Sequence, residues 1–160
     1  MAAYEIRVMT PEEYPLLEDF LYLAIHIPPG QEPPPREVLD SPVLQVYIRG
    51  FGQGKTDRAM VAEIDGKPVG AAWARIMGDY GHVDNATPSL AVAVAEPYRG
   101  QGIGGELLRA LLGALKQAGY RRASLSVQKE NPAVSLYKRL GFQILRESGA
   151  EYIMIKALTD

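Results

Sequence analysis

A glycine-rich turn between an apolar strand and a leucine-rich helix is the feature that most constrains how this chain folds. Residues 90–117 read LAVAVAEPYRGQGIGGELLRALLGALKQ, with glycine at positions 100, 102, 104 and 105. Glycine weakens helices, so this run indicates backbone that turns tightly or approaches another group closely. The apolar residues that follow keep to one face at helical spacing: Ile103, Leu107, Leu108, Leu111, Leu112 and Leu115. The segment therefore predicts a strand, a turn and a helix packed on a sheet.

Apolar periodicity and turn signals predict the other elements. Strands are expected at 4–9, at 58–77 as a hairpin around Asp65-Gly66, and at 90–95, 123–127, 142–147 and 151–158. Helices are expected from Thr10 through residue 25, at 133–140 after an Asn131-Pro132 cap, and, weaker and broken, at 36–52. This order predicts a single α/β (α+β) domain over residues 1–160. Its sheet is mixed, mostly antiparallel, roughly seven-stranded and twisted, with helices on both faces.

Composition excludes several classes of function. The net charge is −2 with no basic stripe or polybasic block, which argues against nucleic acid and membrane surfaces as partners. The first apolar stretch is too short and too charged for a signal or membrane segment, so a cytoplasmic location is expected. The absence of cysteine excludes disulfides, cysteine zinc sites and a cysteine nucleophile. No metal site is predicted, and nothing excludes a homodimer.

The glycine turn is suited to binding a phosphate. The first turn of a helix presents unpaired N–H groups and partial positive charge, glycine lets an anion approach them, and Arg99 adds a fork of donors. A plain strand-to-helix turn explains one glycine but not the alternation at 100, 102 and 104. A P-loop is excluded because no Gly-Lys-Ser/Thr is present. The letters GQGIGG fit a dinucleotide fingerprint, but no acidic residue ends the next strand as that fold requires.

Arg99-x-x-Gly102-x-Gly104 after a strand resembles the acyl-CoA pyrophosphate motif of the GNAT superfamily of N-acetyltransferases. The downstream stretch LSVQKENPAVSLYKRLGF is similar to that family's strand, asparagine-containing turn and tyrosine-bearing helix. The resemblance implies the GNAT-like fold, with strands 4 and 5 parallel and splayed around acetyl-CoA (coenzyme A in its acetylated form). It implies cofactor contacts from Val92, Ala93, Val94, Arg99, Gly100, Gln101, Gly102, Ile103, Gly104, Asn131 and Tyr137.

The resemblance also implies that Tyr137 lies near the thioester sulfur as the catalytic residue, where a phenol donates a proton to the departing thiolate. Structural explanations exist for both downstream residues: Asn131 as a helix cap and Tyr137 as a packed side chain. Because no cysteine is available, direct attack by a primary amine in a ternary complex is favoured. Family members often carry a glutamate where strand 4 begins, but Pro88, Ser89 and Leu90 stand here. The general base is left open among Glu63, Asp79, His82, Asp84 and water.

The acceptor, a small-molecule or protein amine, is expected to meet the least family-like part of the chain. That part comprises residues 14–47 and the loop around Tyr80. Tyr22, His26 and Trp73 are candidate lining residues, and core packing explains them equally well. The missing glutamate motivates an alternative function, a non-catalytic sensor or interaction module that binds CoA or acyl-CoA. A third hypothesis is a nucleotide-binding domain that uses the same turn.

Overall fold

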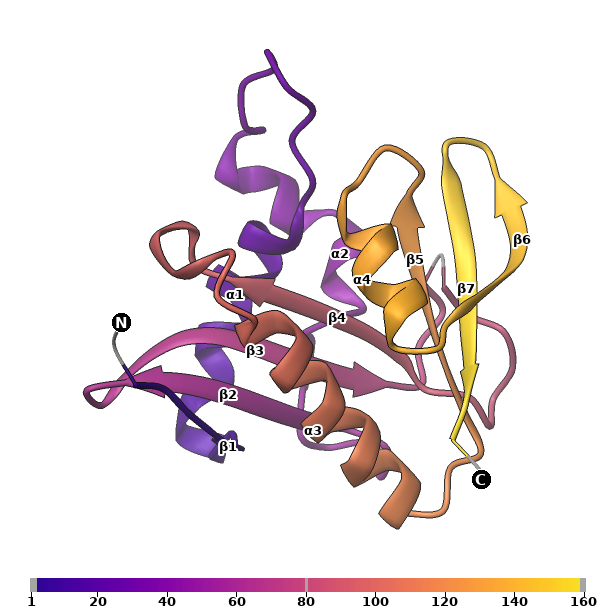
Figure 1. Ribbon diagram of the computed structural model, residues 1–160, viewed down its shortest axis with the longest axis horizontal. Helices are drawn as coiled ribbons and strands as arrows, with labels where there is room; N and C mark the ends of the chain where they lie inside the picture. Colours follow the sequence, from indigo (N-terminus) through magenta and orange to yellow (C-terminus); the bar gives the residue numbers. More distant parts are fainter. Residues whose placement is uncertain (1–2, 80, 159–160) are drawn as a thin grey trace.

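The computed structural model describes residues 3–79 and 81–158 as one sheet with helices on both faces (Figure 1). The sheet has the order β1-β2-β3-β4-β5-β7-β6. The strands are β1 (Glu5–Val8), β2 (Arg58–Ile64), β3 (Lys67–Arg75), β4 (Ser89–Val94), β5 (Arg122–Gln128), β6 (Gln143–Ser148) and β7 (Glu151–Ala157). The helices are α1 (Leu17–Ala24), α2 (Pro42–Gln45), α3 (Ile103–Gln117) and α4 (Ala133–Arg139), with 3-10 turns η1 (Pro11–Leu16), η2 (Arg36–Asp40) and η3 (Glu96–Tyr98). The predicted fold class and element order are confirmed.

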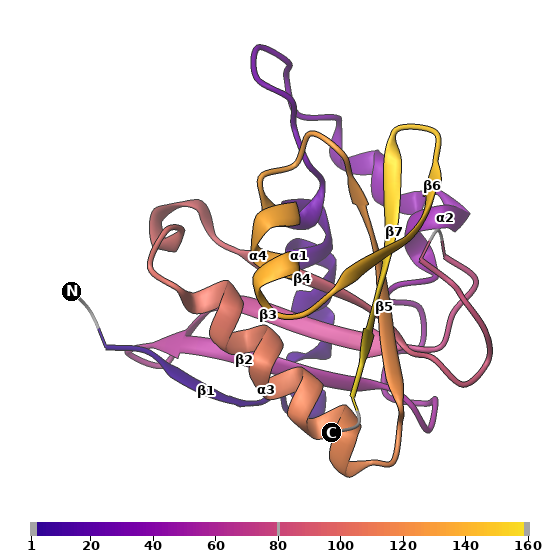
Figure 2. The same ribbon diagram turned by 45° about the vertical axis from the view of Figure 1, so that its right-hand side comes forward.

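Two apolar layers flank the sheet. On one face, α3 buries its whole predicted apolar stripe, from Ile103 to Leu115, against β2, β3 and β4. On the other, α1 packs on β3 and β4 around the fully buried Leu17 and Trp73. Figure 2 shows α3 and α4 in front of the sheet and α1 behind it. The side chains of β4 serve both layers, because alternate residues of a strand point to opposite faces.

The local signals place most boundaries correctly. Asp65 and Gly66 both have positive φ (52° and 79°), as a type I′ turn requires. The first helix differs from the prediction. Thr10 and Glu13 form the predicted capping box. The helix that follows Thr10 is a 3-10 helix over Pro11–Leu16, which contains Pro15, and the α-helix begins only at Leu17. Proline inside a helix removes a backbone donor, which accounts for the delay. Within the described residues, no helix is long and apolar enough to cross a membrane.

Candidate active site

The two parallel strands in the centre of the sheet pair only where they begin. A single register pair, Ser89 with Ser124, joins β4 to β5, and the Ser124 N–H donates to the Pro88 carbonyl at 2.9 Å. Beyond that point the strands diverge toward their carboxyl ends (Figure 1). On its other edge β4 stays paired with β3 to its carboxyl end, where the Ala95 N–H donates to the Val69 carbonyl at 2.8 Å. Because backbone groups alternate along a strand, those of Val92 and Val94 point into the opening.

The glycine turn lies at the carboxyl end of this opening. Gly100 and Gly102 have φ of 78° and 87°, a region that side-chain-bearing residues avoid. A Cβ placed on either glycine would meet no atom within 4 Å, so open space lies above the turn. Gly102 is the N-cap of α3, and its carbonyl accepts the Glu106 N–H at 3.1 Å. The unpaired N–H groups of the first helical turn therefore border an open hollow.

Basic side chains surround this hollow, which we call the glycine hollow. Arg99, Arg109 and Arg139 line it together with Gly100, Gln101, Gly102, Ile103 and Gly104. Arg99 donates from Nε to the Val94 carbonyl at 2.7 Å, which fixes the side chain beside the strand end. Arg109 forms an ion pair with Glu106 at 3.0 Å. The sequence reading missed Arg109 and Arg139, since neither stands in the motif. The net positive lining suits an anion.

A groove leads from the glycine hollow to a second cavity deeper between the strands. The groove and the hollow share Val94, Arg99, Gly104 and Leu136. The groove and the inner cavity share a second set, in which His26, Val92, Asn131 and Tyr137 stand out. The three spaces therefore form one continuous path. Ala93 also lines the groove, so every predicted cofactor residue lies on this path.

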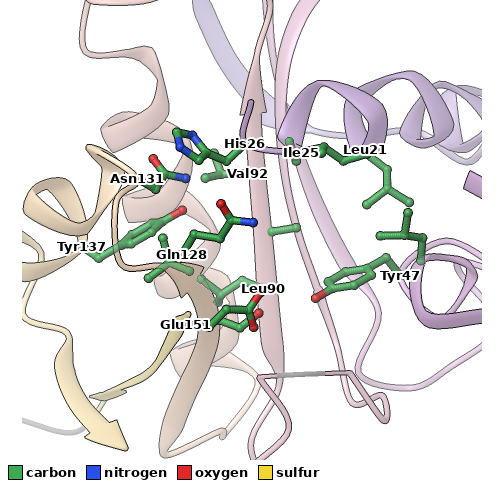
Figure 3. Close-up of a pocket in the computed structure, with 15 residues that line it drawn as sticks. Leu21, Ile25, His26, Tyr47, Leu90, Val92, Gln128, Asn131, Tyr137 and Glu151 are labelled. Atoms are coloured by element: carbon green, nitrogen blue, oxygen red, sulfur yellow. The ribbon is translucent and has the colours of Figure 1, made fainter. Parts of the chain in front are cut away.

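Asn131 and Tyr137 combine structural roles with exposure to the path. The Asn131 Oδ1 accepts the Ala133 N–H at 2.9 Å, as the cap prediction requires. Tyr137 is 8% exposed and contacts the Phe142 ring edge-on, with centroids 6.0 Å apart. Its hydroxyl points into the inner cavity (Figure 3). Burial raises the pKa of Tyr137 to about 12, so the phenol keeps its proton at neutral pH.

The inner cavity has a volume of about 220 Å³ and two unlike walls. One wall is apolar and includes Leu21, Ile25 and Leu44 from the first helices. The other, the polar wall, carries Ser126, Gln128 and Glu151 from β5 and β7, and the Tyr47 hydroxyl points toward it from the side of α1 (Figure 3). His26, from the end of α1, stands where the groove enters, and its buried Nε2 has no hydrogen-bond partner among the described residues. Of the expected acceptor residues, His26 lines this cavity and Tyr22 lines the groove.

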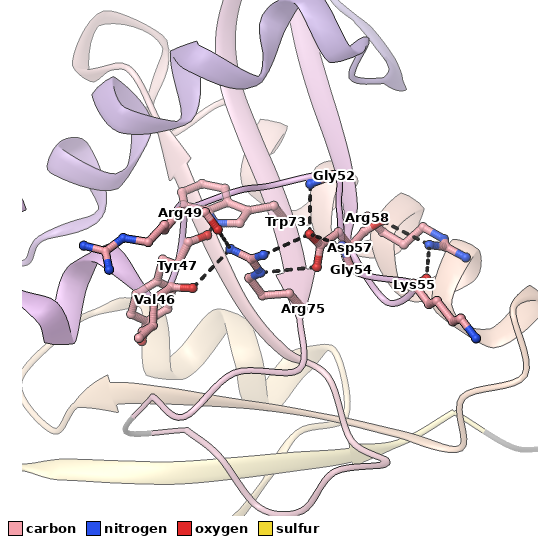
Figure 4. A network of polar contacts seen from close by, with 10 residues as sticks. All are labelled: Val46, Tyr47, Arg49, Gly52, Gly54, Lys55, Asp57, Arg58, Trp73 and Arg75. Carbon is pink, nitrogen blue, oxygen red and sulfur yellow. Dashed lines mark hydrogen bonds and ion pairs between the residues drawn. The ribbon is translucent and has the colours of Figure 1, made fainter.

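A buried polar network holds the segment that carries Tyr47 (Figure 4). Trp73 donates from Nε1 to the Tyr47 carbonyl at 3.2 Å, and Arg75 donates to the flanking Val46 and Arg49 carbonyls. Arg75 is itself paired with Asp57 at 3.0 Å. Of the two explanations of Trp73, the structure supports core packing and not a place in the lining of the inner cavity. Its indole is completely buried in the layer beneath α1, where it positions Tyr47 instead.

Two of the candidate bases are engaged elsewhere. Glu63 lies in β2, where its Oε1 accepts from Arg7 Nε at 2.7 Å. Asp84 is on an exposed loop and forms an ion pair with Arg122. Neither residue lines the inner cavity, so the structure does not bring them to the predicted chemistry.

The other two candidates lie in the loop behind the polar wall. The Asp79 Oδ1 accepts a hydrogen bond from the Ser89 hydroxyl at 2.8 Å, and its Oδ2 is buried with no hydrogen-bond partner among the described residues. Burial raises the pKa of Asp79. The His82 Nδ1 is likewise buried and unpaired among the described groups. Neither side chain lines the inner cavity itself. Tyr80, expected at the acceptor site, lies outside the described residues.

Comparison with known proteins identifies the fold. The model of the acetyltransferase (GNAT) family matches residues 20–142, which is most of the chain. The chain belongs to the GNAT family. A crystal structure of the ribosomal-protein-S18-alanine N-acetyltransferase from Escherichia coli superposes with a TM-score of 0.67 at 20% identity, covering 99% of this chain and 96% of that one. PaiA N-acetyltransferase from Thermoplasma acidophilum in complex with coenzyme A gives 0.70 at 18% identity, covering 97% and 99%.

Sequence relatives of this GNAT chain match over shorter stretches. An N-alpha-acetyltransferase from Sulfurisphaera tokodaii is 38% identical over 92 residues, 52% of this chain and 54% of that protein. A mycothiol acetyltransferase from Corynebacterium aurimucosum is 47% identical over 57 residues, 35% of this chain and 19% of that protein. The chain thus spans about half of one relative and a fifth of the other. The family relationship establishes an acetyltransferase fold without naming the acceptor.

Proposed function

We propose that this GNAT chain is an acetyl-CoA-dependent N-acetyltransferase that acts on a primary amine by direct attack in a ternary complex. The observation that carries the proposal is the continuous path between β4 and β5. It begins at a glycine turn suited to an anion, passes an edge of β4 that makes no ladder with β5 beyond Ser89, and ends at the Tyr137 hydroxyl. An acyl carrier with a phosphate end, an extended amide arm and a reactive end fits that order of groups.

The residues present fit coenzyme A in detail. The N–H groups that follow Gly102, with Arg99, Gly100, Gln101, Ile103 and Gly104, would hold the pyrophosphate. Arg109 and Arg139 add positive charge to the same hollow. The backbone of Val92, Ala93 and Val94 borders the groove, where the free edge of β4 can pair with an amide arm as an added strand would. The Asn131 side chain faces the same groove and has amide N–H groups to offer.

Bound acetyl-CoA supplies the acetyl group as a thioester, whose C–S bond breaks as the amine forms a C–N bond. Tyr137 would donate its phenolic proton to the sulfur that leaves with the electron pair. Its raised pKa keeps the phenol protonated at neutral pH, so its O–H can hydrogen-bond to the sulfur, or donate its proton to it, as negative charge develops there. The groove and cavity walls hold the two reactants together, which converts a bimolecular encounter into an oriented one.

The acceptor would enter the inner cavity with its amine end first. A volume of about 220 Å³ is smaller than sites that enclose a whole drug-sized ligand, so only the reacting end is accommodated. Because relatives are named N-alpha-acetyltransferase and mycothiol acetyltransferase, both protein and small-molecule amines are kept as acceptors in this proposal. A cytoplasmic location and a homodimer stay predictions from the sequence.

A steady-state assay with acetyl-CoA and a broad panel of primary amines tests the proposal. Thiol release above background hydrolysis, with acetylated amine found by mass spectrometry, is expected for at least one acceptor. Tight acetyl-CoA binding without transfer to any amine would instead support the non-catalytic sensor, which the absent glutamate at the start of β4 motivates. Calorimetry with CoA, ATP and NAD separates the nucleotide-binding alternative, since a preference for ATP or NAD would refute CoA as the ligand.

A further inference from the structure

Glu151 occupies a special place in the inner cavity. It is the first residue of β7, and the β5–β7 pairing sets it opposite Gln128 on the polar wall. Among the described residues that line the cavity, Glu151 is the only carboxylate. Figure 3 shows it on the floor between the Tyr47 and Tyr137 hydroxyls, which point inward from opposite sides. An amine that enters the cavity therefore meets one acidic group.

Burial and a second carboxylate act on the charge of Glu151. Burial raises the pKa of Glu151, and the nearby Asp79 carboxylate raises it further. The Tyr47 hydroxyl lies close to both carboxylates, and burial followed by the Asp79 charge raises its own pKa, so it stays neutral. Asp79, from the loop before β4, acts on Glu151 through its charge. The titratable groups that share the cavity or the neighbouring strands with Glu151 are Tyr47, His26, Tyr137, Lys129, Glu147 and Tyr152.

We propose that Glu151 receives the proton of the acceptor ammonium and is the general base of the reaction; this inference rests on the proposed function. An ammonium N–H bond breaks, an O–H bond forms on the Glu151 carboxylate, and the electron pair stays on nitrogen as the lone pair that attacks. Once the C–N bond has formed, the nitrogen loses a second proton, which replaces the one that Tyr137 gave to sulfur. The proton on Glu151 leaves for solvent before the next cycle, so each turnover releases one proton. An amine near its ordinary pKa of ~10.4 enters mostly as the cation, which the carboxylate also attracts.

Two other groups compete for this role and are less well placed. His26 stands where the groove meets the cavity, next to Asn131 and Val92, which is the path of the acyl carrier. Asp79 lies behind the wall, and one of its oxygens already accepts from Ser89. Asp79 instead acts as a positioning charge, since it keeps the proton affinity of Glu151 high.

The pH dependence of kcat/KM for Glu151→Gln is the first test. In the wild type, activity should be flat between the pKa of Glu151 and that of the amine. The variant should lose about 10²- to 10⁴-fold at pH 7. Its activity should then rise about tenfold per pH unit toward the pKa of the amine, because only the neutral amine reacts. The matched control is Glu147→Gln, one strand away and outside the cavity, which should keep the wild-type profile.

Two further variants decide between the competing groups. His26→Asn and Asp79→Asn should both retain the acidic limb of the profile. In Asp79→Asn that limb should move to lower pH, because removing the like charge lowers the pKa of Glu151. If the limb persists in Glu151→Gln and disappears in either of the other variants, Glu151 is not the base and the inference is overturned.

A titration of the Glu151 carboxyl carbon by NMR gives a readout independent of turnover. We expect a pKa above the usual glutamate range, lowered in Ser89→Ala, since losing that hydroxyl makes Asp79 harder to ionise. Ser124→Ala is the control, because this equally buried hydroxyl donates to the Gly81 carbonyl instead. An ordinary Glu151 pKa that neither variant changes contradicts the inference even if the wild type is active. A protein that acetylates none of the amines would refute the proposed function instead, whatever pKa is measured for Glu151.

Discussion

Replacing Gly102 by alanine isolates the contribution of the turn to cofactor binding. The residue sits at φ 87°, where an L side chain costs roughly 1–2 kcal/mol. No heavy atom lies within 4 Å of the new Cβ, so no steric clash adds to that strain. For a chain of this size the loss lowers Tm by about 2–8 °C. The new methyl group also points into the space where a phosphate would approach the helix N–H groups.

The expected loss of CoA affinity exceeds what strain explains. Displacing one hydrogen bond between a backbone N–H and a charged phosphate costs about 1.5–3 kcal/mol, or roughly 10- to 100-fold in Kd. Gly119→Ala is the matched control. Gly119 ends the same helix, has φ 97° and equally open surroundings, and lies far from the hollow. It should show the same fall in Tm with CoA affinity unchanged.

Calorimetric titration of CoA into both variants, with thermal unfolding in parallel, checks the reasoning. Equal CoA affinities in Gly102→Ala and the wild type would refute the assignment of this turn as the pyrophosphate site. Equal losses in the two variants would show that affinity follows global stability rather than the local contact.

Three other changes test separate parts of the structure. Tyr137→Phe should lower kcat by about 10²-fold while CoA affinity stays the same, as steady-state and calorimetric measurements together would show. Asp57→Asn leaves the buried Arg75 charge without its partner and should cost roughly 3–5 kcal/mol in urea unfolding, with a raised KM for the amine. The hydrogen bond from Arg7 lowers the pKa of Glu13 to about 2 from 4.5. This pair therefore stabilises the fold above pH 4.5 and loses its effect as the pH falls toward 2. In Glu13→Gln the part of the fall in Tm between pH 4.5 and 2 that comes from this pair should disappear.

Local sequence signals predicted most of the fold and one end of the site. The turn at Gly102, the buried face of α3 and the Asp65-Gly66 hairpin each depend on residues within a few positions of one another. Backbone conformation and apolar spacing decide such features, so they can be read from the chain. The exception near the N-terminus is also local, because Pro15 outweighs the capping box and delays α1.

The polar wall of the inner cavity could not be read in the same way. Glu151 faces Tyr47 only because β7 inserts between β5 and β6 and because Trp73 anchors a loop from another layer. Pairings over such sequence distances leave no periodicity in either segment. One local signal was available. Glu151 is a carboxylate at the start of β7, a strand whose apolar residues predict a place inside the sheet rather than at its edge.

The missing family glutamate and the presence of Glu151 have one physical explanation. At the start of β4 the side chain of Ser89 is 1% exposed and donates to Asp79. A glutamate there would bring a second buried carboxylate against Asp79, and two like charges without a cation between them are costly in a buried site. Serine instead stabilises the Asp79 charge, which in turn raises the proton affinity of Glu151 across the cavity floor. On the proposal that Glu151 is the base, the departure at Ser89 moves the acidic group of the site to β7 rather than removing it.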